Sequence, residues 1–104
     1  MEHLEFTLDA GGTPPSGEFA HAGVVGSGNL EVLLEREALG GHCVAVVDTA
    51  IRGFERTWQQ VLSDFVTRQQ LADVRISIND GGATPAVVGL RLDQAAAELK
   101  RGAA

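Results

Sequence analysis

The sequence predicts an α+β fold: a mainly antiparallel sheet of about five strands with two helices on one face, in the order β-β-β-β-α-β-α. Two observations support this fold class. Apolar and polar residues alternate with a period of two through most of the first half, which is the pattern of half-buried strands. Two later segments carry apolar residues at helical spacing. Strands gathered early and helices late favour separate layers, and we expect one domain over residues 1–104.

Four strands are expected in the first half of the chain, each from alternating side chains. A stretch rich in glycine and proline at residues 10–17 separates the first strand from the second, because these residues sustain neither a helix nor a ladder. The second and third strands follow each other across a short connection, which makes them an antiparallel pair. The expected ranges are 4–9, 18–26, 30–35 and 42–48.

The pattern changes to a helical period after residue 53. We expect one helix with Trp58 and Phe65 as its main buried anchors, lying across the sheet. Its polar residues fall on the opposite side. The apolar stripe consists of Phe54, Trp58, Val61, Leu62 and Phe65.

A fifth strand is expected at residues 74–79, followed by a turn and a second helix. Thr84 is suited to cap this helix, and Pro85 suits its first position, where a missing N–H costs nothing. A turn followed by a cap is the favoured interpretation of residues 81–85, with anion binding at the helix N-terminus as the alternative. The expected buried stripe is Val88, Leu92, Ala95 or Ala96, and Leu99, with Lys100 and Arg101 closing the last turn.

Composition excludes several classes of function. The net charge of −6 with a single lysine argues against a nucleic-acid partner, which a basic surface would attract. No apolar run approaches the roughly 20 residues of a membrane-spanning helix, so we expect no membrane partner. One cysteine excludes an internal disulfide and fits a reducing, cytoplasmic location.

Residues that could form an enzymatic or metal site are sparse. The three histidines, His3, His21 and His42, show no ligand spacing, so no metal site is expected. Cys43 lies within an apolar run and is expected to be a buried core residue. Glu31 and Asp80 could form a carboxylate pair in space, but the sequence alone does not bring them together.

The connection between the second and third expected strands contains Ser27 between Gly26 and Gly28. Glycine tolerates positive φ and has no Cβ, so the two glycines allow a tight reversal and leave the serine hydroxyl uncrowded. One interpretation is a hairpin turn that happens to contain serine. The other is a hydroxyl offered for covalent modification. Ser27 is not in a nucleophile elbow, because an elbow leads into a helix and this segment leads into a strand.

Three segments resemble one known family. Residues 24–35 (VVGSGNLEVLLE) resemble the acyl carrier, or delta, subunit of malonate decarboxylase, as do residues 79–85 (NDGGATP), with a continuation through Val87 and Val88 to residues 90–92 (LRL). Residues 58–60 (WQQ) give a weaker third match. The carrier subunit of citrate lyase is a more distant relative in role. The fatty-acid type of carrier is a helical bundle with an Asp-Ser-Leu motif at a helix start. Neither feature is present here, so a helical acyl-carrier bundle is not expected.

The resemblance implies a function and a site. Ser27 would carry a covalent phosphoribosyl-dephospho-CoA arm through a phosphodiester, with Gly26 and Gly28 as the flanking turn. The thiol of the arm would carry acetyl and then malonyl, and the chain itself would catalyse no step. The implied partners are the acyl transferase and decarboxylase subunits, a prosthetic-group transferase and a malonyl transferase.

Other hypotheses stay open at this point. Ser16, in the loop rich in glycine and proline, is the second candidate for attachment. A non-covalent adaptor subunit of a multienzyme complex is the alternative function. A small free-standing enzyme that uses Cys43 or a histidine is the third.

Overall fold

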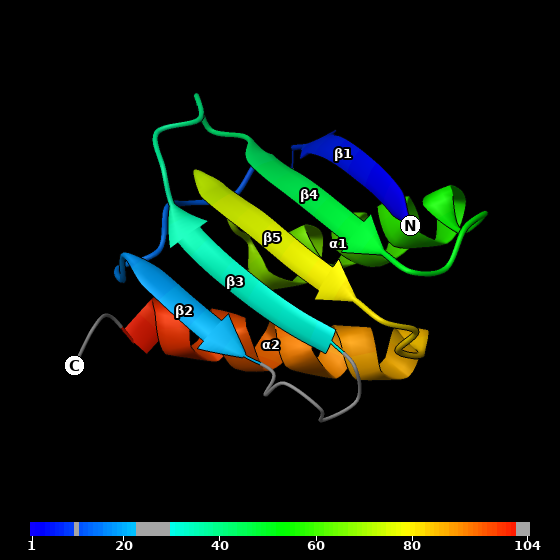
Figure 1. Ribbon diagram of the computed structural model, residues 1–104. Helices are drawn as coiled ribbons and strands as arrows, with labels where there is room; N and C mark the ends of the chain where they lie inside the picture. Colours follow the sequence, from blue (N-terminus) through cyan, green and yellow to red (C-terminus); the bar gives the residue numbers. More distant parts are fainter. Residues whose placement is uncertain (10, 23–29, 102–104) are drawn as a thin grey trace.

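The computed structural model describes residues 1–9, 11–22 and 30–101, and its elements follow the predicted order (Figure 1). The α+β class is confirmed, and the fold is not a helical bundle. The second strand, expected over 18–26, is described over 19–22, and residues 23–26 lie outside the described part. The elements are β1 (Glu2–Leu8), β2 (Phe19–Ala22), β3 (Leu30–Arg36), β4 (Cys43–Thr49), α1 (Glu55–Gln69), β5 (Val74–Asp80) and α2 (Pro85–Arg101).

The five strands form one sheet in the order β1-β4-β5-β3-β2. The β4–β5 pair is parallel, and the other three pairs are antiparallel. A parallel pair needs a crossover connection, and α1 provides it between β4 and β5. The sequence predicted the mainly antiparallel character of the sheet and left the strand order open.

The strand register places the buried side chains on one face of the sheet. Val47 of β4 lies opposite Leu4 of β1 and opposite Ile78 of β5, and Ile78 in turn lies opposite Val32 of β3. All four side chains are buried. Residues two apart along a strand share a face, so the rows above and below repeat this arrangement. One face of the sheet therefore carries the core.

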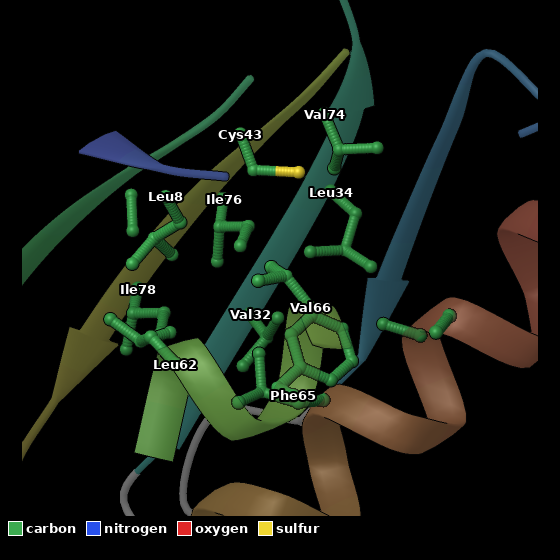
Figure 2. Packing of buried hydrophobic residues seen from close by; sticks show 14 of the residues in the cluster. Leu8, Val32, Leu34, Cys43, Leu62, Phe65, Val66, Val74, Ile76 and Ile78 are labelled. Atoms are coloured by element: carbon green, nitrogen blue, oxygen red, sulfur yellow. The ribbon is translucent and has the colours of Figure 1, made fainter. Parts of the chain in front are cut away.

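Both helices cover this face (Figure 1). α1 packs against β1, α2 packs against β2 and β3, and the two helices contact each other. Figure 2 shows side chains of α1 lying against side chains of the sheet within the buried cluster. The labelled residues of α1 are Leu62, Phe65 and Val66, and those of β3 and β5 include Val32, Ile76 and Ile78. The predicted placement of two helices on one face is confirmed.

The buried stripe of α1 agrees with the prediction in part: Val61 is only half-buried, and Val66, which was not predicted, is buried. Trp58 and Phe65, the expected anchors, are buried, as is Leu62. Phe54, expected in the stripe, is 51% exposed because the helix begins at Glu55 and Phe54 is its N-cap residue. Neither helix described here is long and apolar enough to cross a bilayer.

Replacing Phe65 by alanine is expected to destabilise the fold strongly. Its side chain is fully buried, and such a truncation leaves a cavity that costs about 3–5 kcal/mol. Phe19→Ala is the matched control because Phe19 is 65% exposed on β2, and we expect a change within about 0.5 kcal/mol. Urea unfolding measures both free energies. Equal losses in the two variants would contradict this description of the core.

Candidate functional site

Pairing of β3 with β5 brings together the two segments that the sequence analysis singled out. Leu30 lies opposite Asp80, and Glu31 lies opposite Asn79, 48 residues away in the sequence. The start of β3, the end of β5 and the start of α2 therefore meet at one end of the sheet (Figure 1). We take this end of the sheet as the candidate functional site.

The predicted attachment residue Ser27 and its neighbours Gly26 and Gly28 lie outside the described residues. Their position is bounded by covalent geometry, because consecutive Cα atoms lie 3.8 Å apart and three peptide units span at most about 11 Å. The Cα of Ser27 is therefore within about 11 Å of the Cα of Leu30. Leu30 is buried at the start of β3, so this reference point is held firmly by the sheet.

Asp80 organises the turn between β5 and α2. Its carboxylate is almost fully buried, and Oδ2 accepts a hydrogen bond of 2.8 Å from the hydroxyl of Thr49. Oδ1 accepts hydrogen bonds from the backbone N–H groups of Gly82 (3.1 Å) and Ala83 (2.8 Å). Gly82 has a φ of +121°, a conformation that favours glycine. One carboxylate thus joins the ends of β4 and β5 to the start of α2.

Glu31 and Asn79 lie on the opposite face of the sheet from Asp80. Asn79 Nδ2 donates a hydrogen bond of 3.4 Å to Glu31 Oε1, and His21 Nε2 lies 3.4 Å from Glu31 Oε2. The carboxylate pair considered for Glu31 and Asp80 does not form, because neighbouring positions along a strand point to opposite faces. These two carboxylates therefore do not form an acid–base pair.

The start of α2 follows the turn-and-cap interpretation. Thr84 Oγ1 accepts a hydrogen bond of 3.4 Å from the backbone N–H of Val87, and the helix begins at Pro85. The N–H groups of Gly82 and Ala83 already donate to Asp80. These two donors, which could have held an external anion, are thus used within the chain.

A cavity of about 380 Å³ opens beside Asp80, between the first turns of the two helices. Trp58 and Val61 of α1 and Val88 of α2 form part of its wall, together with Asp80. Phe54, expected in the buried stripe but 51% exposed, lines the same cavity. No local sequence pattern predicts this cavity, because it forms where the parallel β4–β5 pair ends beside the starts of both helices.

The other candidate residues do not form a site. Among the described residues, no group of three potential ligands could hold a metal ion. Hydrogen bonds to Asp48 and to Glu5 raise the pKa of the exposed His3. Cys43 is buried as predicted, and this burial raises the pKa of its thiol, so thiolate is scarce near neutral pH. Ser16, the second attachment candidate, is exposed near Arg36, at the end of β3 far from Leu30.

Replacing Asp80 by alanine is expected to destabilise the protein by about 2–3 kcal/mol, because buried donors lose a charged acceptor. Asp64→Ala is the matched control, since Asp64 is exposed and accepts one hydrogen bond from Gln60. We expect a change within about 0.5 kcal/mol in the control. Urea unfolding of both variants tests this role, and a loss at Asp80 no larger than at Asp64 would refute it.

Cys43 is expected to react slowly with thiol reagents in the folded protein. Only the thiolate attacks, and both burial and the raised pKa reduce its accessible population. The rate should rise with pH well beyond neutrality, and it should rise sharply when urea unfolds the chain. A colorimetric disulfide reagent measures it. Rapid reaction of the native protein at pH 7 would restore Cys43 as a candidate nucleophile.

Comparison with known proteins identifies the family. The family model described as malonate decarboxylase delta subunit (MdcD) matches residues 18–99. The malonate decarboxylase acyl carrier protein of Burkholderia cepacia is 58% identical over 101 residues, covering 95% of this chain and 91% of that protein. Its counterpart in Stenotrophomonas maltophilia (strain R551-3) is 59% identical over 105 residues, covering 98% and 97%.

A solved structure shows the same similarity in three dimensions. One chain of a Pseudomonas malonate decarboxylase hetero-tetramer in complex with malonate superposes with a TM-score of 0.79 at 40% identity. The match covers 95% of this chain and 99% of the solved one. Family model, relatives and structure agree over most of the length. The chain therefore belongs to the family of malonate decarboxylase delta subunits, the acyl carrier proteins of that enzyme.

Proposed function

We propose that this protein carries acetyl and malonyl thioesters for a malonate decarboxylase on a phosphoribosyl-dephospho-CoA arm, joined through a phosphodiester to Ser27. The observation that carries the proposal is the family match over residues 18–99, a range that includes Ser27 and both segments that meet at the end of the sheet. When bound, the arm supplies a thiol on which malonyl replaces acetyl, with release of acetate, and decarboxylation then regenerates the acetyl thioester.

The described part of the chain is compatible with such an attachment. Ala22 of β2 pairs with Val32 of β3, and β2 is an edge strand. The connection carrying Ser27 therefore joins two neighbouring strands at the edge of the sheet. Val32 and Leu34, which follow in β3, are fully buried. An arm joined to this connection is therefore next to a rigid strand, and its attachment need not disturb the core. Gly26 and Gly28 would give a transferase close access to the hydroxyl.

The proposed role is non-catalytic. The described histidines do not form a metal site, and Cys43 is buried with a raised pKa. A tethered acyl group instead reaches several active sites at a raised effective concentration. The proposed partners are the acyl transferase and decarboxylase subunits, a malonyl transferase and the transferase that loads the arm. The similar chain in the solved hetero-tetramer supports the subunits as partners. A cytoplasmic location completes the proposal, in keeping with the single cysteine.

Intact mass spectrometry after co-expression with the loading enzymes tests the attachment. We expect the mass of one arm on the parent chain, none on Ser27→Ala, and one on Ser16→Ala, the matched control at the second candidate serine. An arm that persists in Ser27→Ala, or is lost in Ser16→Ala, would overturn the assignment. Decarboxylase activity retained by a complex containing Ser27→Ala would favour the non-covalent adaptor instead.

A further inference from the structure

We propose that the cavity between the starts of the two helices receives the acetylated end of the arm and shelters its thioester between encounters with partner subunits. This inference rests on the proposed function, because the occupant is the arm on Ser27. It adds a second site to the carrier: one residue attaches the arm, and a separate cavity holds its far end.

The cavity lies within reach of the attachment residue. Asp80 is part of its wall and pairs with Leu30 across neighbouring strands, where opposed Cα atoms are about 5 Å apart. The three peptide units between Leu30 and Ser27 span at most about 11 Å. The Cα atoms of Ser27 and Asp80 therefore lie within about 16 Å of each other. The arm comprises a phosphoribosyl group, a dephospho-CoA diphosphate and a pantetheine chain, so its extended length exceeds this span.

The size and lining of the cavity suit a pantetheine thioester. Its volume of about 380 Å³ falls in the range of small-molecule sites, of roughly 300–1,000 Å³. Ile51 (43% exposed) and Phe54 (51%) line it, two of the large apolar side chains left exposed on the described surface. An apolar ligand would cover them. Thr84 Oγ1 accepts from Val87, which leaves its hydroxyl proton to donate to a carbonyl of the arm.

Charge selects which acyl group the cavity takes. No lysine or arginine is among the described residues that line it, and the one acidic residue among them is Asp80, whose carboxylate is almost fully buried. A malonyl thioester would bring a second carboxylate without a cationic partner, and burying such a charge is costly. An acetyl thioester is neutral and meets no such cost. The cavity therefore holds the acetylated arm, and the malonylated arm stays outside, available to the decarboxylating subunit.

The fluorescence of Trp58 gives a direct measurement of binding, because Trp58 is the single tryptophan of the chain and lines the cavity. We expect S-acetylpantetheine, titrated into the unmodified protein, to change the Trp58 emission with a saturating curve. Malonyl-pantetheine should bind at least tenfold more weakly. A dissociation constant in the millimolar range is sufficient, since a tethered arm reaches millimolar effective concentration. Equal responses to both probes, or none to the acetyl probe, would overturn the proposal.

A matched pair of variants on α1 tests whether the acetyl probe binds in the cavity. Thr57 lines the cavity and Thr67 lies near the other end of the helix, and both are exposed. Thr57→Phe should block the cavity and abolish the response to the acetyl probe, while Thr67→Phe should respond like the parent chain. A circular dichroism melt confirms that both are folded. A full response in Thr57→Phe would overturn the proposal.

Measurements on the protein that bears the arm distinguish a failure of this inference from a failure of the proposed function. Mass spectrometry first establishes whether Ser27 bears the acetylated arm. If it does, Trp58 emission should differ from that of the unmodified chain, and hydroxylamine should cleave the thioester several-fold faster in Thr57→Phe than in Thr67→Phe. A loaded Ser27 with no difference in either measurement defeats the cavity proposal alone. An unloaded Ser27 defeats the proposed function, and the titration with free probe still decides whether the cavity binds.

Discussion

The pairing of β5 with β3 on one side and β4 on the other is the constraint on which the rest of the structure depends. β5 is the central strand, and Asp80 at its end lies opposite both Leu30 and Thr49. Its carboxylate accepts hydrogen bonds from the hydroxyl of Thr49 and from two N–H groups of the turn before α2. These bonds hold the ends of β4 and β5 and the start of α2 in fixed positions. A shift in the register of β5 by one residue would turn the side chain of Asp80 to the open face of the sheet. The apolar side chains of β5 would leave the core at the same time.

The parallel β4–β5 pair decides where a cavity can form. Because both strands run in the same direction, their carboxyl ends meet at the same edge of the sheet, next to the start of each following helix. Open sheets of parallel strands bind ligands at this edge. Here a single parallel pair within an antiparallel sheet has the same effect: Thr49, Ile51 and Trp58 come to line one cavity with Asp80. The antiparallel pair β3–β5 brings the start of β3 to the same place.

The sequence predicted the elements well because side-chain periodicity reports which face of an element is buried. It identified Trp58 and Phe65 as anchors and Thr84 as a cap. Periodicity does not report which strands are neighbours, so the strand order could not be derived. It also does not mark the first residue of a helix, and Phe54 was therefore placed in the core. Periodicity also does not show that Asp80, which follows the expected fifth strand, is buried and accepts hydrogen bonds from the turn after it.

The candidate site was harder to predict from the sequence than the fold, because it combines an attachment residue with a cavity, and the two leave different signals in the sequence. Spacing and glycine flanks left Ser27 open to two interpretations, and only the family resemblance favoured attachment. The cavity is lined by residues far apart in the sequence, such as Trp58 and Val88, and no local pattern encodes that they meet around one space. A carrier has to hold a reactive thioester firmly enough to keep water away and loosely enough to release it. For the arm proposed here, the apolar wall of the cavity would shelter the acetyl thioester, and Asp80 would disfavour the additional negative charge of a malonyl group, so the cavity would hold the two acyl groups with different affinity.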